Sequence, residues 1–332
     1  MAGAPMQEVV IHNQMIRFGD RMGVSFHRTL RIPEDMKSYP LPAGLGRFPI
    51  YKVSEFTDRL PSQWQSSNAG FIPMYQCEAL WIGFNGAAWK PNAVVVAVGG
   101  INALSGEPLE VPLREDPQNY LVAPPQPWLD GINCESGRVR QFVAAPLGNG
   151  RTIESVVSGK ASRGGIQISV FEPKPGRFPD TPLDAGPTPL DEQEILRPMH
   201  KPLQPMGIRA GGRIVQKIYI DPYGVDTWDL ENVGHAMLHI VNSRQFEKIT
   251  GQAPPPTPLN AKQYSEQGLP WFQRYDEEMV GIGPSQILSA IGENTAPSGQ
   301  GDPAATDDSI DLANIEPKTI GRKKKGHSQK NP

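Results

Sequence analysis

The chain is short of cysteine and of long apolar runs. Its 332 residues contain two cysteines, Cys77 and Cys134, which are too few for the disulfide framework of a secreted scaffold. We expect both to be buried free thiols in a reducing compartment, with a single bridge as the alternative. No stretch approaches about 18 consecutive apolar residues, so no transmembrane helix is predicted. The first residues show no basic segment followed by an apolar one, and we therefore expect no secretory signal and a cytoplasmic location.

An excess of charge of either sign is also missing. The formal net charge is -3 and the sequence pI is about 6.1. The chain as a whole therefore gives no electrostatic reason to expect nucleic acid or an acidic membrane surface as a partner. For the basic stretch Arg322–Lys325, a solvated tail is favoured over contact with nucleic acid or lipid. Neither nucleic-acid binding nor membrane insertion is predicted.

Glycine and proline, by contrast, are abundant. The 34 glycines and 35 prolines make up about a fifth of the chain, against roughly an eighth in average proteins. They disfavour long helices and favour short strands joined by turns. In Ala79–Val98, two apolar, β-rich runs flank the turn signal Asn85-Gly86. The sequence predicts a central β-hairpin at this stretch.

Apolar patterns with a period of two continue on both sides of the hairpin. Between Val9 and Glu172 there are roughly nine candidate strands with turn signals between them. This density predicts a mainly β fold, with an antiparallel β-sandwich or jelly-roll-like core and a smaller α+β C-terminal part. Expected strands include Thr152–Ser158, Gly165–Glu172, Arg213–Ile220 and His235–Val241, and expected helices are Leu190–Leu196, Ser243–Thr250, Ala261–Gln267 and Trp271–Glu278.

Shifts in composition divide the chain into five expected regions. They are a flexible N-terminus at 1–8, a sandwich-like domain at 9–172, a proline-rich connection at 173–207, an α+β part packed on the sandwich at 208–292, and a disordered tail at 293–332. The tail is assigned because an acidic block precedes a basic block, without aromatic residues or periodicity.

The densest group of carboxylates in an ordered region is Asp221, Asp226 and Asp229. Oxygen-rich loops of this kind bind calcium or magnesium, or position general acids and bases. Tyr223 and Trp228 beside the acids also resemble a sugar-binding loop. The favoured alternative is structural, an Asx-type turn in which Asp221 and Asp229 accept backbone amides.

His235 and His239 are four residues apart. On a helix or on a strand they share one face, and with Asp221 they are candidate ligands of a zinc-type site. The residues between them are Ala-Met-Leu, so the His-Glu-x-x-His helix of metalloproteases is not present. Two histidines bonded to neighbours on a half-buried strand are the favoured interpretation, and no metal or cofactor is predicted.

Aromatic rings stand beside prolines in several loops. Trp128 follows Pro127, and Trp271 follows Pro270. Rings on stiff backbone make stacking platforms for sugars or peptides, and the equally weighted alternative is that they close the ends of a sandwich. The candidate ligand-binding residues are Trp128, Tyr223, Trp228 and Trp271.

Several stretches resemble predicted bacterial proteins that have no assigned activity. They are Arg31–Asp35 with Tyr39–Gly46, Pro124–Gly131, and His239–Ser243 with Gly251–Pro258. The resemblance covers most of residues 25–275 and implies a soluble, ordered domain. It carries over no catalytic residue.

The sequence shows no catalytic constellation, whereas aromatic and proline-rich loops are plentiful. It therefore predicts a non-catalytic binding or assembly protein that presents these loops to a protein or glycan partner, with self-association into a homo-oligomer left open. The alternative is a metal-dependent or carbohydrate-active hydrolase that uses the Asp221–His239 region. The enzyme needs those acids and histidines in one cleft, and the binding protein needs exposed rings on one face.

Overall fold

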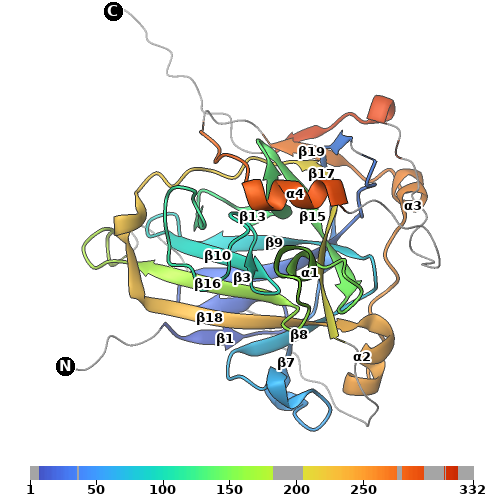
Figure 1. Ribbon diagram of the computed structural model, residues 1–332, viewed down its shortest axis with the longest axis horizontal. Helices are drawn as coiled ribbons and strands as arrows, with labels where there is room; N and C mark the ends of the chain where they lie inside the picture. The colour runs from blue at the N-terminus through green and yellow to red at the C-terminus, as the bar shows by residue number, and fades with distance from the viewer. Residues whose placement is uncertain are drawn as a thin grey trace, which may run out of the picture.

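The protein is mainly β. The computed structural model describes residues 7–35, 37–181, 205–274, 279–294, 310 and 312–320. Within these residues, 17 strands form one large, mostly antiparallel sheet, and three strands form a small mixed sheet. Figure 1 shows β10 (Asn92–Val98), β16 (Ile166–Pro173) and β18 (Trp228–Asn242) running across the molecule, with short helices around them. The expected mainly β class is confirmed, and the finer expectation of a sandwich or jelly roll stays a prediction.

The remaining elements are short. The other strands of the large sheet are β1 (Val9–Ile11), β2 (Ile16–Phe18), β3 (Met22–Thr29), β4 (Ser38–Tyr39), β6 (Gly44–Arg47), β7 (Tyr51–Lys52), β8 (Ala69–Met74), β9 (Ala79–Gly86), β11 (Ile101–Asn102), β12 (Leu121–Ala123), β13 (Trp128–Leu129), β14 (Gly131–Glu135), β15 (Arg138–Pro146) and β17 (Pro205–Val215). The small sheet contains β5 (Leu41–Pro42), β19 (Trp271–Arg274) and β20 (Lys318–Ile320). The helices are α1 (Ile153–Ser158), α2 (Ser243–Thr250), α3 (Ala261–Glu266) and α4 (Gln286–Asn294), and the 3-10 turns are η1 (Val53–Glu55), η2 (Ser62–Trp64), η3 (Val225–Thr227) and η4 (Leu312–Asn314). In the described part of the chain, no helix is long and apolar enough to cross a membrane.

Strand β10 is covered on both of its faces. Val94 and Val96 belong to the main hydrophobic core, whereas Ala93 and Val95 belong to a second apolar cluster that also contains Trp228. Along its edges β10 pairs with β16 on one side and with β11 and β12 on the other. A strand buried on both faces requires a continuous apolar run, which explains the consecutive valines.

The hairpin predicted at Ala79–Val98 is not formed, although both of its strands are. Strand β9 pairs with β3, β13 and β15, and β10 pairs with β11, β12 and β16. The turn signal Asn85-Gly86 lies inside β9, because β9 extends to Gly86, which is the register partner of Met22 in β3. A local turn signal is outweighed here by pairing with a distant strand.

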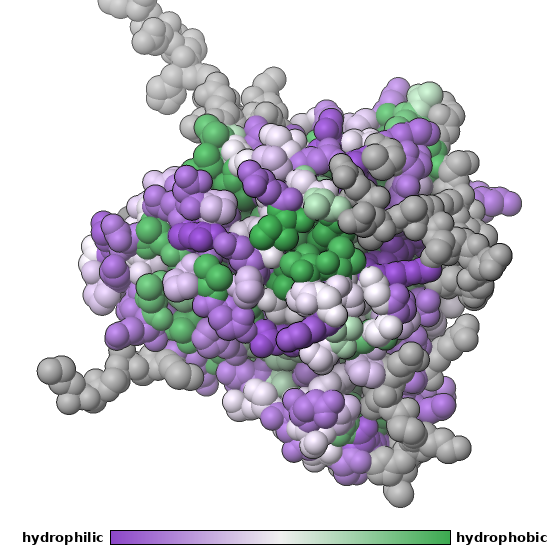
Figure 2. Space-filling view, viewed as in Figure 1, coloured by the Kyte–Doolittle hydropathy of each residue, from purple (hydrophilic) through white to green (hydrophobic). Residues whose placement is uncertain are grey.

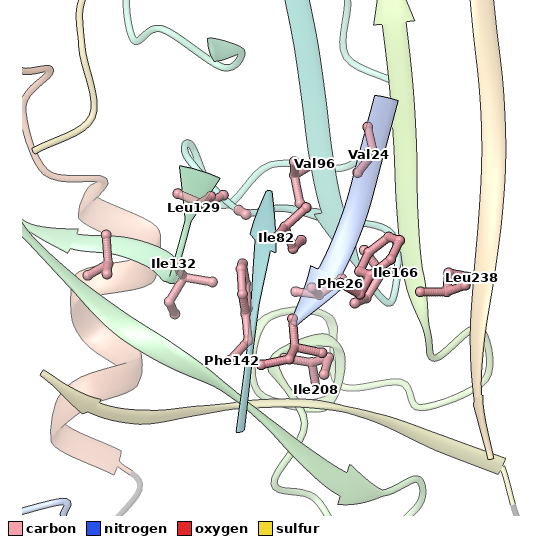
Figure 3. Packing of buried hydrophobic residues seen from close by; sticks show 14 of the residues in the cluster. Val24, Phe26, Ile82, Val96, Leu129, Ile132, Phe142, Ile166, Ile208 and Leu238 are labelled. Carbon is pink, nitrogen blue, oxygen red and sulfur yellow. The ribbon is translucent and has the colours of Figure 1, made fainter. Parts of the chain in front are cut away.

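One core joins the segments before and after residues 182–204. Strand β18 and most of β17 lie in the region 208–292, which the sequence assigned to an α+β part packed on the sandwich, and they pair with β16 and β15 in the large sheet. Figure 3 shows Phe26, Ile82 and Ile166 from the first segment close to Ile208 and Leu238 from the second. Both segments therefore contribute strands to one sheet and side chains to one core.

Residues Thr152–Ser158 form helix α1 in place of the predicted strand. The Thr152 hydroxyl accepts a hydrogen bond from the Ser155 backbone N–H at 3.2 Å, and Gly159 ends the helix in the left-handed region with φ of 70°. These two capping signals outweigh the strand preference of the valines between them. The expected helices at α2 and α3 are confirmed.

Residues Trp271–Arg274 form a strand where the sequence predicted a helix. Strand β19 pairs with the distant strand β5 in the register Trp271↔Pro42 and Phe272↔Leu41, and it pairs with β20 as well. Strand β20 and turn η4 also differ from the disordered tail expected for 293–332. The expected helix at 190–196 lies outside the described residues, and so does the expected tail except for residues 293, 294, 310 and 312–320.

Helix α4 packs on β14. Its Ile287 is 43% exposed. Figure 2 shows a mixed surface on this side of the molecule, with a hydrophobic patch close to the position that α4 has in Figure 1. This face is therefore not uniformly hydrophilic.

Candidate functional site

The carboxylate of Asp221 is a centre of hydrogen bonds within the fold. Its Oδ2 accepts from the Tyr120 hydroxyl at 2.6 Å and from the Trp228 indole N–H at 2.9 Å. Its Oδ1 accepts from the backbone N–H of Tyr223 at 2.8 Å. Burial and the neighbouring Asp221 carboxylate raise the pKa of Tyr120, so its hydroxyl remains a donor at neutral pH. Both oxygens of Asp221 thus connect the residue before β12, the start of β18 and the loop between β17 and β18.

Asp226 and Asp229 have different surroundings. Asp226 is exposed on η3. Asp229 accepts from the backbone N–H groups of Glu231 at 3.0 Å and Asn232 at 3.4 Å. The Asx-type turn that the sequence favoured is therefore present at both Asp221 and Asp229. A catalytic role for the three carboxylates stays a prediction.

His235 and His239 lie on strand β18, and this placement sets the distance between them. Two residues four apart lie about 6 Å apart on a helix, but about 13 Å apart on a strand that rises about 3.3 Å per residue. The ring of His239 is 6% exposed and stacks on Trp64 with 4.0 Å between the ring centroids. His235 is exposed and bonds to Ser169. Among the described residues, no group of three or more His, Cys, Asp or Glu side chains is placed to hold a metal ion.

His235 lines an open groove of about 290 Å³ on the outer face of β16 and β18. We call this the polar groove, and its lining residues are Ser66, Asn68, Leu109, Gln167, Ile168, Ser169, His235, Ala236 and Met237. Ser169 and His235 are register partners in the β16–β18 pair, and their Oγ and Nδ1 atoms lie 2.8 Å apart. Although His235 is exposed as a residue, its imidazole is partly buried, and this lowers its pKa, so the ring is uncharged at neutral pH.

A hydroxyl within hydrogen-bond distance of an imidazole is the first half of a nucleophile–base pair. The second half is a group that orients the base, usually a carboxylate on the other ring nitrogen. None of the described residues that line the polar groove is a carboxylate. The contact with Ser169 also uses Nδ1 and leaves Nε2 for another partner. The geometry suits hydrogen bonding to a ligand better than activation of Ser169.

The four aromatic residues singled out from the sequence have four different environments. Trp228 is fully buried, and Trp271 is 9% exposed and packs against Tyr264 with 5.3 Å between their centroids. Tyr223 is 43% exposed. Trp128 is half-buried, at the start of β13. Of the four, Tyr223 and Trp128 present ring surface to solvent, and a ligand-binding role for any of them stays a prediction.

Trp128 belongs to a row of rings that crosses three strands. Its ring meets Trp81 of β9 edge to face at 6.5 Å, and Trp81 in turn stacks on His27 of β3 at 3.7 Å and an interplanar angle of 6°. On the other side of Trp128, the guanidinium of Arg274 lies 5.5 Å from the ring centroid and 4.9 Å from that of Tyr219. We call His27, Trp81, Trp128 and Arg274 the aromatic row, and all four are half-buried.

Buried polar groups and a glycine next to the aromatic row contribute to its packing. The amide of Gln216 donates to the buried carboxyl of Asp130 at 2.7 Å. Burial raises the pKa of Asp130 to about 7, although the neighbouring side chains of Trp128 and Gln216 act to lower it. Gly83 is the register partner of Trp128, and a Cβ there would lie 3.1 Å from both His27 and Trp81. The absence of a side chain at Gly83 allows the rings to pack closely across the strands.

Both cysteines are free thiols, as expected. Cys134 is 3% exposed, and burial raises its pKa to about 11. Cys77 is half-buried, has φ of 64° and lies 3.9 Å from the guanidinium of Arg209. The expectation of burial holds for Cys134 and not for Cys77.

Sequence reasoning missed most members of both surfaces. Trp81 was included only as part of an apolar strand, and His27, Arg274, Ser169 and Asn68 carried no signal because their partners are distant in the chain. The period-two pattern of β16 did place Ser169 on the face opposite Ile168, which is the one cue that the sequence offered. Comparison with known proteins gives no further guidance, since no family model, curated protein or solved structure matches the chain.

Proposed function

We propose that the protein is a non-catalytic binding protein that docks a polypeptide partner on the aromatic row. The observation that carries this proposal is the stack itself: two tryptophans, a histidine and an arginine are packed on one another at 3.7–6.5 Å while remaining half-buried. Tryptophan and arginine are the residues most enriched at the energetic centres of protein interfaces. A rigid row loses little side-chain entropy when a partner binds.

The surroundings of the row indicate the chemistry of the partner. His27 covers one face of Trp81, and the Arg274 guanidinium lies over the ring of Trp128, so the row combines a guanidinium with ring edges, which carry partial positive charge. The exposed Arg47 is the register neighbour of His27. Burial and the Arg47 charge lower the pKa of His27 to about 4, so the positive charge at the row comes from the guanidinium groups of Arg47 and Arg274. This combination favours a segment with carboxylates beside aromatic or proline side chains.

The hydrolase alternative has less support. Glycoside hydrolysis uses two carboxylates on either side of the scissile bond. Both oxygens of Asp221 bind donors of the fold, and Asp229 caps its own turn. The histidines of the same region are separated along β18, as described above.

The proposal is tested with an array of short peptides in which acidic, proline and aromatic residues are varied independently. We expect peptides that combine acidic with aromatic or proline residues to bind and to change the tryptophan fluorescence. Trp81→Ala or Arg274→Gln should weaken the best peptide by about 30-fold, which corresponds to the loss of an interface centre of about 2 kcal/mol. Absence of binding by any peptide, or binding that neither substitution weakens, contradicts the proposal.

The chain offers a matched control for these substitutions. Trp89 is also half-buried and also lies beneath an arginine, with Arg21 at 5.7 Å from its ring centroid. It stands in the segment between β9 and β10, outside the row. Trp89→Ala should leave the affinity for the best peptide unchanged.

A further inference from the structure

We propose that the polar groove binds a neutral saccharide unit, at a site separate from the aromatic row. The groove is built from three parts of the chain: the segment after η2, Leu109, and the outward-facing side chains of β16 and β18. None of its residues belongs to the aromatic row. The inference goes beyond the polypeptide docking proposed above and does not depend on it.

The lining carries no formal charge. Its polar members are two serines, an asparagine, a glutamine and a histidine, and the histidine is uncharged at neutral pH because burial lowers its pKa. A charged ligand would lose hydration in the groove without gaining a partner of opposite charge. A neutral ligand that is rich in hydroxyl groups loses less and can be bonded by the serines, Asn68 and His235, whereas the Gln167 amide is used within the fold.

The polar side chains are held in position before a ligand arrives. The Asn68 amide donates to the backbone carbonyl of His235 at 3.1 Å. The Gln167 amide donates to the carbonyl of Gly164 at 2.9 Å and contacts the sulfur of Met237 at 3.1 Å. Because these contacts already fix the lining, little conformational entropy is lost on binding.

The Ser169–His235 pair is matched to a hydroxyl group. If the Ser169 hydroxyl donates to Nδ1 of His235, Nε2 carries the ring proton and donates to the ligand; in the other tautomer Nε2 accepts. A sugar hydroxyl both donates and accepts, so it fits either tautomer. A carboxylate oxygen accepts only and fits one.

The position of the groove in the sheet argues for a saccharide over a peptide strand. Extended peptides are bound by adding a strand to a free sheet edge. Strand β16 is flanked by β10 and β18, and β18 is flanked by β16 and β8 in the register Met237↔Ala69. Their backbone groups are used within the sheet, so the groove offers side chains to a ligand.

The size and the apolar part of the lining complete the match. Ligand pockets occupy roughly 300–1,000 Å³, and a groove of about 290 Å³ lies at the lower end, where one ring fits. Leu109 and Met237 supply apolar surface for the C–H faces of that ring, whereas Ile168 and Ala236 belong to the main core behind the groove. Since the groove is open, neighbouring units of a chain can extend from it.

The test is a titration of the full chain with neutral trisaccharides of glucose, mannose, galactose, xylose and N-acetylglucosamine, beside galacturonate and glucosamine trimers as charged probes. Binding is followed through labelled methionine methyl groups, with the Met237 signal assigned by Met237→Leu. We expect at least one neutral trisaccharide to shift the Met237 signal. Ser169→Ala and His235→Ala should each weaken that trisaccharide about 3- to 10-fold, the usual effect of one hydrogen bond.

Two controls separate this result from other causes. His12→Gln changes a histidine between β1 and β2, outside the groove, and should leave the affinity unchanged. Trp128→Phe disturbs the aromatic row and should also leave saccharide affinity unchanged, so the two proposals fail independently. The inference is overturned if no neutral trisaccharide shifts Met237, if a charged trimer binds as tightly as the best neutral one, or if a short neutral peptide shifts Met237 equally.

Discussion

Trp228 and Trp128 each stand next to a buried aspartate but serve different parts of the molecule. The indole of Trp228 donates to Asp221 at 2.9 Å, and the Trp128 side chain acts to lower the pKa of Asp130. Trp228 is fully buried, because the second face of β10 packs over it, whereas Trp128 is half-buried and stands in the aromatic row. A neighbouring aspartate therefore does not decide the exposure of a tryptophan, and the strands around the ring decide whether solvent reaches it.

The largest difference between the two tryptophans should appear in stability. Trp228→Ala removes a fully buried ring and leaves a cavity between β10 and β18, so we expect it to lower the free energy of unfolding by about 3–5 kcal/mol. Trp128→Ala should cost roughly 1–3 kcal/mol, because solvent already reaches part of that ring. Denaturant-induced unfolding of both variants measures the difference. Equal losses would mean that Trp128 is as much a core residue as Trp228.

The next largest effect concerns the carboxylate beneath Trp228. Asp221→Ala leaves the Tyr120 hydroxyl and the Trp228 N–H buried without an acceptor, and we expect a loss of about 2–4 kcal/mol in the free energy of unfolding. Asp226→Ala is the matched control, since Asp226 is exposed in the same loop and should change stability by less than about 0.5 kcal/mol. A loss of stability in Asp221→Ala as small as that in Asp226→Ala would argue against a structural role for Asp221.

The carboxyl of Asp130, next to Trp128, should make the stability of the protein depend on pH. Burial raises the pKa of Asp130 to about 7 in the folded protein, against about 3.9 when unfolded. The folded state then binds more protons than the unfolded state between these values, so this contribution to stability is complete below about pH 4 and is lost as the pH rises towards 7.

Asp130→Asn removes that titration. We expect the free energy of unfolding of the variant, relative to that of the wild type, to be higher at pH 8 than at pH 5. Denaturant unfolding of both proteins at the two pH values measures this difference. Asp226→Asn, followed in parallel, controls for a general effect of removing one charge. A stability difference between Asp130→Asn and the wild type that is independent of pH contradicts the account of Asp130.

The smallest effect is expected at the other end of the aromatic row. The pKa of His27 is lowered to about 4 by burial and by the charge of Arg47, against about 6.5 when unfolded. Stability from the neutral ring is present above about pH 6.5 and is lost as the pH falls towards 4. His27→Phe keeps a ring on Trp81, and it should gain about 1 kcal/mol or less over the wild type at pH 5, because the ring is half-exposed to screening solvent.

His239 provides a second, more deeply buried example of a histidine stacked on a tryptophan. It lies on Trp64 as His27 lies on Trp81, its pKa is also lowered to about 4, and it is only 6% exposed. In the same unfolding experiment, His239→Phe should therefore also gain stability over the wild type as the pH falls, and this gain should be larger than that of His27→Phe. A larger effect at His27 would show that burial is not the cause of the two low pKa values.

The features that the sequence predicted are those that neighbouring residues determine. The mainly β class followed from apolar alternation and from glycine and proline, and the Asx-type turns at Asp221 and Asp229 followed from local chemistry. The pairing of strands did not follow, because β9 finds β3 and β15 rather than β10. For the same reason Trp128 could be named as a candidate, while its neighbours Trp81 and Arg274 could not.

The central claim is that Trp128 is held at a binding surface while Trp228 is held in the core. The indole N–H signals of the six tryptophans, assigned by single substitutions, test it directly when the best peptide of the array is added. The account predicts that the signals of Trp81 and Trp128 shift and that the signal of Trp228 does not. A shift at Trp228 with none at Trp128, or no shift at either, would contradict it.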